Sequence, residues 1–277
     1  MISVLRKTLA SYLYHSARSR ALFSLYGVVI KEVRVSFRQF FTWDYPFTSL
    51  VRVITIILST LNRLFLGRSL KYSFSFTGED RILEGLLKPI ITENGFYVDV
   101  GCNHPIFLSN SYGFYRKGWK GICVDANKEL IKKYRYYRPK DIAVCALVSD
   151  QTQELTFYNS QNDVLSTVEM SNVELMRQEG LSYYLSRMIP QTLTAILQKC
   201  NAPPQFKFLS VDVEEHDLNV LMSLDLNKFK PNVIVVEDES FDPVDPKNNR
   251  IYNYLKQWNY EIEGFILKNL YFRRIVH

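Results

Sequence analysis

Two acidic residues stand at the ends of two consecutive predicted strands. Residues 96–101 read Phe-Tyr-Val-Asp-Val-Gly, and residues 121–125 read Gly-Ile-Cys-Val-Asp. A glycine at the end of a strand lets the backbone turn sharply and delivers a ligand to the start of the next helix. Asp125 follows Gly101 by 24 residues, a spacing at which an acid can bind the two hydroxyls of a ribose. The pair predicts a site for a nucleoside-containing cofactor, although both acids could instead cap strand-to-helix turns.

The number of glycines separates one nucleoside cofactor from another. A dinucleotide site needs three glycines in the pattern G-x-G-x-x-G, because a pyrophosphate lies against the turn. Here Gly101 is followed by Cys-Asn-His-Pro-Ile-Phe, without a second or third glycine. S-adenosylmethionine has a ribose and an adenine but no phosphate, so it suits this loop better. We expect Asp99 to face the amino-acid end of this cofactor and Asp125 to bind its ribose.

A second group of ionisable residues ends a later predicted strand, where residues 209–217 read Leu-Ser-Val-Asp-Val-Glu-Glu-His-Asp. In an extended chain, side chains two residues apart share a face, so Asp212, Glu214 and His216 would point together into a pocket. A methyl-accepting hydroxyl needs a base whose pKa is near neutrality. His216 fits that role, with Asp212 or Glu214 orienting it. The alternative is that His216 and Asp217 only cap the following helix.

Other uses of these acids stay open at this stage. Asp212, Glu214, Glu237 and Asp238 could offer oxygens to Mg²⁺, but we prefer a site without a metal. Glu237, at the end of a predicted strand, is a candidate substrate residue. His104 either shapes the cofactor turn or contacts the substrate.

From residue 72 onward, predicted strands alternate with predicted helices, which indicates an α/β fold with a doubly wound, mostly parallel sheet. A C-terminal antiparallel hairpin is expected over residues 260–265 and 270–275. Residues 159–205 have the least regular pattern and are expected to form the wall that selects the substrate. The ligand should bind at the carboxyl ends of the parallel strands. The other expected strands are 96–100, 121–124, 142–148, 154–158, 206–213 and 231–236, and the expected helices include 80–87, 128–138 and 218–224.

Residues 1–71 differ from the rest in charge. They carry eleven Lys or Arg against two acidic residues, a net charge of +9, whereas the whole chain carries +6. The most apolar stretch, residues 50–66, is interrupted by Arg52, Asn62 and Arg63 and is too short to span a bilayer. It has the pattern of an amphipathic helix, which would either lie on an anionic membrane or pack on the body of the protein. We expect two parts, a basic helical extension over 1–71 and a catalytic domain over 72–277.

The four cysteines form no C-x-x-C pair, which favours a reducing compartment and disfavours structural zinc. We therefore expect a cytoplasmic protein, with peripheral contact to the cytoplasmic face of the membrane if the extension binds lipid.

The chain resembles the FkbM-type family of S-adenosylmethionine-dependent methyltransferases. The resemblance is carried by residues 75–80 (Ser-Phe-Thr-Gly-Glu-Asp), 96–110, 118–125 and 209–217. It implies a Rossmann-like class I methyltransferase fold over about residues 72–274, with a helix at 192–197 before the catalytic strand. It also implies O-methylation of a hydroxyl on a sugar, glycan or related metabolite. The implied cofactor residues are Asp99, Gly101, Asn103, Asp125, Ala126, and, near the adenine, Ser149 and Asp150.

This chain departs from the family pattern at Glu215, where glycine is usual, so the turn after the catalytic strand is expected to differ. An RNA methyltransferase is the main enzymatic rival, because the basic extension could follow a phosphate backbone. Against it, the catalytic strand ends in Asp-Val-Glu-Glu, not in an Asn-Pro-Pro-aromatic sequence that grips a flipped base, so nucleic acid is not the expected partner. A membrane-bound scaffold with a degenerate methyltransferase fold is the non-enzymatic rival.

Overall fold

The computed structural model describes residues 54, 58, 73–88, 94–160 and 166–275. The chain divides into two compact units, Met1–Tyr72 and Ser73–His277. Of the predicted basic extension, only Ile54 and Leu58 are described, and both are helical. The rest of the extension, with most of its predicted amphipathic helix, lies outside the described residues. Among the residues that are described, no helix is long and apolar enough to cross a membrane.

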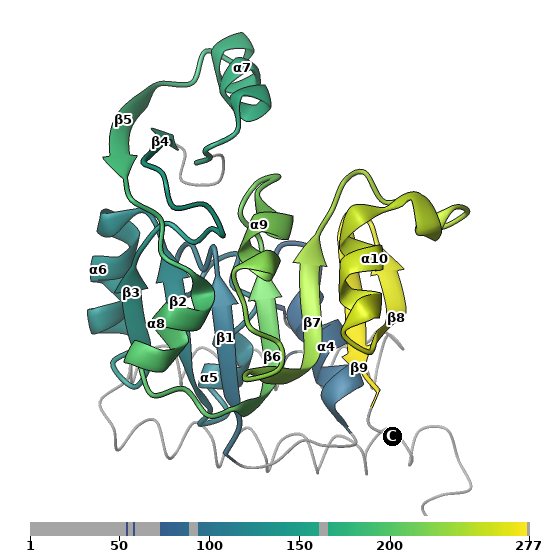
Figure 1. The fold of residues 1–277 in the computed structure, drawn as a ribbon. Coiled ribbons are helices and arrows are strands. Elements are labelled where there is room, and N and C mark those ends of the chain that lie inside the picture. Colours follow the sequence, from purple (N-terminus) through teal and green to yellow (C-terminus); the bar gives the residue numbers. More distant parts are fainter. Residues whose placement is uncertain (1–53, 55–57, 59–72, 89–93, 161–165, 276–277) are drawn as a thin grey trace, which may run out of the picture. The chain divides into compact units, whose positions relative to one another are not determined.

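The second unit is built on a seven-stranded sheet in the order β3-β2-β1-β6-β7-β9-β8 (Figure 1). The first five strands in this order are parallel, and β9 and β8 form an antiparallel hairpin at one edge. This is the predicted doubly wound α/β sheet with a C-terminal hairpin. Its strands are β1 (Phe96–Val100), β2 (Lys120–Asp125), β3 (Ile142–Cys145), β6 (Gln205–Val211), β7 (Lys230–Glu237), β8 (Tyr260–Ile266) and β9 (Asn269–Arg274).

Helices cover both faces of this sheet. On each face, buried apolar side chains of the helices and the strands form one cluster. On one face, Val98 and Leu209 pack with residues of α8 (Leu193–Lys199), α9 (Asp217–Met222) and α10 (Arg250–Gln257). On the other face, Tyr97 and Phe208 pack with residues of α4 (Glu79–Leu87), α5 (Tyr112–Tyr115) and α6 (Lys128–Tyr137). The alternation of Tyr97 and Val98 between the two clusters follows from the period-two pleat of a strand. A short 3₁₀ helix, η3 (Pro246–Asn248), precedes α10.

Two parallel strands end earlier than predicted, and both ends have the same cause. β3 stops at Cys145, which pairs with Asp125, the last residue of β2. β6 stops at Val211, which pairs with Val100, the last residue of β1. Beyond these points β2 and β1 offer no further partner, because the chain has already turned away at Ala126 and Gly101; on its other side β6 also leaves β7, which continues to Glu237. The predicted extensions to Val148 and Val213 are therefore wrong.

The segment predicted to be irregular contains regular structure. β4 (Leu155–Ser160) pairs antiparallel with β5 (Tyr183–Met188) in a separate two-stranded sheet, and α7 (Met170–Gln178) lies between them in sequence. We call residues 155–188 the insertion. Figure 1 shows it standing beyond the carboxyl ends of the parallel strands, where the ligand is expected. The strand over 154–158 was predicted, but its partner β5 was not.

Candidate functional site

Gly101 forms a tight turn at the end of β1. Its backbone has a φ of 75°, and its N–H donates to the carbonyl oxygen of Val124 at 2.9 Å. A Cβ atom at this position would lie 1.7 Å from the carbonyl oxygen of Asp212. Only glycine therefore lets β1 approach the end of β6 so closely. Residues 102–111 then form a loop that connects this turn to α5.

The carboxylate of Asp125 joins this loop to the end of β2. One of its oxygens accepts from the N–H of Asn103 at 2.9 Å, and the other accepts from the N–H of Asn127 at 2.7 Å. Asn127 in turn caps α6, since its side-chain oxygen accepts from the N–H of Glu129 at 3.0 Å. The ionised form of Asp125 thus holds two backbone segments beside the cavity.

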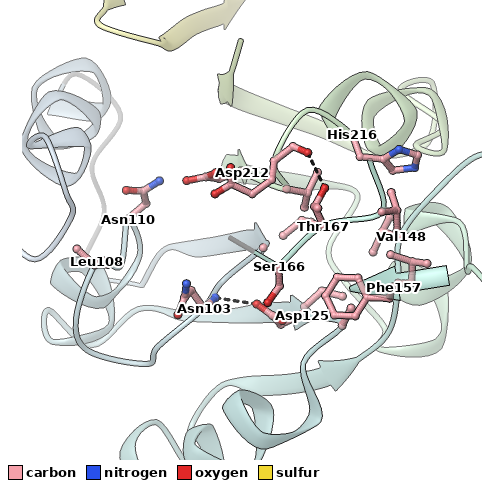
Figure 2. A pocket seen from close by; sticks show the side chains of 18 of the residues that line it. Asn103, Leu108, Asn110, Asp125, Val148, Phe157, Ser166, Thr167, Asp212 and His216 are labelled. Atoms are coloured by element: carbon pink, nitrogen blue, oxygen red, sulfur yellow. Dashed lines mark hydrogen bonds between the residues drawn. The ribbon is translucent and has the colours of Figure 1, made fainter. Parts of the chain in front are cut away.

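A cavity of about 250 Å³ opens at the carboxyl ends of the strands (Figure 2). Gly101, Asn103, Asp125 and Ala126 line it, as predicted for cofactor residues. One part of its wall is apolar and is made by Ala146, Leu147, Val148 and Phe157. Another part is polar and is made by Glu79, Asn110, Asp212, Glu214, Lys268 and Asn269.

Carboxylates gather at the polar part. Carboxylate oxygens of Asp212, Glu214 and Glu237 lie within 4.8 Å of one another, and Lys268 forms an ion pair with Glu237. Burial and the nearby charge of Glu237 raise the pKa of Glu214 to about 7. The same two causes raise the pKa of Asp212 well above its usual range. The Lys268 ammonium compensates the charge of Glu237, and the carboxyls of Asp212 and Glu214, which line the cavity beside Lys268, both have raised pKa values.

Two acids from the sequence analysis lie outside this cavity wall. Glu237 is 5 % exposed, pairs with Lys268 and does not line the cavity, so it is not placed to touch a substrate directly. Asp238 turns away, because its carboxylate accepts from the backbone of Ser240 at 2.8 Å and from the side chain of Asn249 at 2.7 Å.

Asp212, Glu214 and His216 all line the cavity, as expected, but the chain that carries them is not extended after β6. Glu214 and Glu215 both have positive φ, 55° and 72°, which reverses the chain. His216 reaches the cavity wall, but its ring turns away from Asp212 (Figure 2). Its Nδ1 lies 2.8 Å from Glu169 and its Nε2 lies 3.0 Å from the Ser149 hydroxyl. The orienting partner of His216 is therefore Glu169 of the insertion, not Asp212 or Glu214.

Asp99 is buried beneath the cofactor loop and does not line the cavity. It is 3 % exposed and accepts from the Ser111 hydroxyl, and burial raises the pKa of its carboxyl. The buried guanidinium of Arg138 donates to the same hydroxyl at 2.9 Å and pairs with Asp141 at 2.7 Å. Asp99 thus supports the loop from below and is not placed to reach a cofactor in the cavity, contrary to the expectation that it faces the amino-acid end.

Three further predicted residues also lie outside the cavity wall. The Ser149 hydroxyl contacts His216, and Asp150 accepts from the side chain of Asn219 at 2.8 Å. The apolar wall lies a few residues earlier, at Leu147 and Val148. His104 takes the first of its two expected roles, because its Nδ1 accepts from the N–H groups of Ile106 and Phe107, each at 3.2 Å, and so shapes the loop.

The sequence matches the model of the methyltransferase FkbM domain over residues 99–262. The chain belongs to this family. The FkbM match covers the cofactor loop, the insertion and β6. It establishes a methyltransferase and implies the use of S-adenosylmethionine.

Among the solved structures, three similar chains are all methyltransferases by description. A candidate RNA methyltransferase from Pyrococcus horikoshii has 11 % identity and a TM-score of 0.39, with 74 % of this chain and 88 % of that chain covered. A TehB-like SAM-dependent methyltransferase from Corynebacterium glutamicum has 11 % identity and a TM-score of 0.37, with 79 % and 96 % covered. The methyltransferase domain of METTL16 has 10 % identity and a TM-score of 0.42, with 81 % and 80 % covered. No curated protein matches the sequence significantly.

The residues of this FkbM-family cavity fit S-adenosylmethionine by their chemistry. The apolar wall of Leu147, Val148 and Phe157 suits an adenine ring, and the Asp125 carboxylate suits a pair of ribose hydroxyls. A pyrophosphate would meet the Asp125 and Asp212 carboxyls, which favours a cofactor without phosphate. Sequence reasoning found Asp125 through its spacing from Gly101. It missed Phe157 and Lys268, because neither follows a strand of the parallel series.

Proposed function

We propose that this enzyme transfers the methyl group of S-adenosylmethionine to a hydroxyl oxygen of a sugar, glycan or related metabolite. The observation that carries the proposal is the Glu214 carboxyl at the polar end of the cavity, whose raised pKa of about 7 suits a general base at neutral pH. Glu214 replaces His216 in this role, because the His216 ring turns away from Asp212 and its Nε2 atom faces the Ser149 hydroxyl, which lies outside the cavity wall (Figure 2).

The bound cofactor supplies an electrophilic methyl group on a sulfonium, which leaves as a neutral thioether. Glu214 accepts the hydroxyl proton as the oxygen attacks, so the proton passes to the protein while the O–CH₃ bond forms and the S–CH₃ bond breaks. Burial and the nearby charge of Glu237 raise the pKa of Asp212, and in its protonated form this carboxyl can donate a hydrogen bond to a second acceptor oxygen. The remaining requirement is in-line placement of the two reacting atoms.

The polar part of the wall also suits an acceptor with several hydroxyls. Asn110, Asn269 and Glu79 line it together with Lys268, and amide and carboxylate groups can donate to or accept from neighbouring hydroxyls. Phe76, which is 75 % exposed, lies in the same wall and offers an aromatic surface to the apolar face of a sugar ring.

The test is to incubate the full chain with methyl-labelled S-adenosylmethionine and fractionated cell extract. We expect label in a glycan or small-molecule fraction, as a methyl ether by mass spectrometry. Glu214→Gln should reduce kcat by at least about 100-fold, the usual scale for loss of a general base. Glu239→Gln is the matched control, because Glu239 is a neighbouring carboxylate whose side chain is 69 % exposed. Label in nucleic acid alone, or an unchanged kcat for Glu214→Gln, would refute the proposal.

The proposal extends to residues 1–71, whose net charge of +9 suits contact with an anionic membrane surface from the cytoplasmic side. A membrane-bound glycan or lipid-linked acceptor would then be close to the enzyme. Cell fractionation of the full chain and of a chain that begins at residue 72 tests this. We expect the full chain in the membrane fraction and the shorter chain in the soluble fraction. Both chains in the soluble fraction would contradict the extension.

A further inference from the structure

The turn that carries Glu214 is held by the insertion. The Thr167 hydroxyl and the Asn172 side-chain amide both donate to the carbonyl oxygen of Glu214, each at 3.2 Å. The first of these bonds is drawn in Figure 2. Thr167 is 1 % exposed and Asn172 is 8 % exposed, so water does not readily replace either donor. A single backbone carbonyl thus receives two hydrogen bonds from a segment about 45 residues earlier in the chain.

The conformation that these bonds hold is unfavourable by itself. Glu214 and Glu215 lie in the left-handed region, with φ of 55° and 72°, and neither is glycine. Residues with a side chain adopt this conformation rarely, and two in succession need support from their surroundings. The rest of the turn is held on the β6 side, because the N–H of Val213 donates to Asp217 at 3.2 Å and that of Asp212 donates to Val100 at 3.1 Å.

The two residues that follow Glu214 also contact the insertion. The Ser171 hydroxyl donates to the exposed carboxylate of Glu215 at 2.6 Å. The Nδ1 atom of His216 lies 2.8 Å from the Glu169 carboxylate. The bond to Glu215 is exposed and adds little to the hold on the turn, whereas His216 is buried. Ser166, Thr167 and Val168 line the cavity itself.

We propose that Asn172 and Thr167 are positioning residues, which hold the left-handed turn so that the Glu214 carboxylate faces the cavity. This inference rests on the proposed role of Glu214 as the base. It assigns the insertion a part in the chemistry besides forming a wall. The segment that bounds the acceptor space also orients the group that deprotonates the acceptor.

The geometry explains why the turn controls this carboxylate. In the held conformation, Glu214 faces Glu237 of β7 and Lys268 of the β8–β9 turn, with Glu215 and Glu239 as the other charged neighbours. If the turn relaxed toward negative φ, the side chain would leave this surrounding and meet more water. Its environment would then be that of an ordinary surface glutamate.

The experiment compares Asn172→Leu, which keeps a similar volume but has no donor, with Ser171→Ala. Ser171→Ala is the matched control, because it removes an exposed hydrogen bond from the adjacent residue of α7. In Asn172→Leu we expect kcat to fall about fivefold to tenfold, on the scale of one lost hydrogen bond, with an unchanged Kd for S-adenosylmethionine. In Ser171→Ala both quantities should stay within twofold of the wild type.

A second measurement does not depend on activity. Carbon-13 NMR of labelled glutamate carboxyls, with Glu214 assigned from the Glu214→Gln variant, gives the titration midpoint of this residue. The midpoint should move by about one pH unit toward the ordinary glutamate range in Asn172→Leu and stay in place in Ser171→Ala. An unchanged midpoint, or a kcat loss matched by an equal loss of cofactor affinity, overturns the positioning role. Failure to find an O-methylated product overturns only the proposed function, because the titration still decides whether Asn172 holds Glu214.

Discussion

Replacement of Gly101 by alanine is the sharpest test of how the cofactor loop is built. The new Cβ would lie 1.7 Å from the carbonyl oxygen of Asp212 and 2.7 Å from its carbonyl carbon. Non-bonded heavy atoms settle at about 3.5 Å, so the ends of β1 and β6 would have to separate by nearly 2 Å, or about half that contact distance. Neither neighbour is the flexible end of a side chain, and the strain cannot be relieved by a change of rotamer.

The expected loss of stability follows from the contacts that this movement breaks. The N–H of Gly101 donates to Val124 at 2.9 Å, and the N–H of Asp212 donates to Val100 at 3.1 Å. Each buried hydrogen bond contributes about 1 kcal/mol. The left-handed φ of 75° costs alanine roughly 1–2 kcal/mol more than glycine. The free energy of unfolding should therefore fall by about 3–4 kcal/mol, which lowers Tm by roughly 10 °C in a unit of this size.

Gly118→Ala is the control for this variant. Gly118 also has a positive φ, 93°, but a Cβ atom added there would have no other atom within 4 Å. In Gly118→Ala the free energy of unfolding should fall only by the cost of the left-handed conformation, about 1–2 kcal/mol. Urea denaturation gives both free energies, and calorimetry gives the Kd of S-adenosylmethionine, which should weaken in Gly101→Ala alone. If the two variants lose equal stability, the close approach of Gly101 to Asp212 is not what requires glycine.

Further predictions concern the cavity and the turn after β6. Asp125→Asn should weaken S-adenosylmethionine binding by about tenfold or more, because its amide would turn a donor toward the N–H of Asn103 or Asn127. Asp150→Asn should leave the Kd unchanged in the same calorimetric titration, since Asp150 contacts Asn219 outside the cavity. The kcat should rise with pH through the Glu214 pKa of about 7, and this acidic limb should vanish in Glu214→Gln. Because the folded pKa of this acid is raised from 4.5, the free energy of unfolding should also fall as pH rises from about 4.5 to about 7, and less so in Glu214→Gln. Glu215→Gly should raise the free energy of unfolding, measured by urea denaturation, by about 0.5–1 kcal/mol, since it relieves a φ of 72° and loses only an exposed hydrogen bond. A loss of stability would show that the Ser171 contact matters more than the backbone strain.

The cofactor half of the cavity was predictable because its signals are local. The bounds of β1 agree with the prediction at both ends, since an apolar run is closed by a glycine that the turn requires. Asp125 ends the next strand of the parallel series, so its place beside Gly101 follows from strand order alone. Asp99 could not be placed in the same way, because the pleat of β1 puts its side chain on the face of the sheet that α4, α5 and α6 cover. A count of acids at strand ends does not show that difference.

The polar half was not predictable, because the residues that make it come from separate parts of the fold. Lys268 lies in the hairpin between β8 and β9, and Asn269 opens β9. Phe157 and Thr167 come from the insertion, whose two strands form a separate sheet. The turn at Glu214 uses left-handed residues that carry no glycine signal, and its hydrogen-bond donors are about 45 residues away. Sequence period and propensity describe neighbours along the chain, and these contacts join residues that are distant in it.

Glu215 stands where glycine is usual in the family, and this difference bears on how the turn that carries Glu214 is supported. A glycine there would adopt the left-handed conformation without strain, so the turn would depend less on the insertion, although Glu214 would keep its own φ of 55°. With glutamate in that position, the same turn depends on Thr167 and Asn172 for support. The double variant Glu215→Gly with Asn172→Leu should therefore recover part of the kcat that Asn172→Leu loses, because the turn again tolerates positive φ without its second donor. A double variant no better than Asn172→Leu would mean that the donor acts on the Glu214 carbonyl in some way other than by holding the backbone conformation.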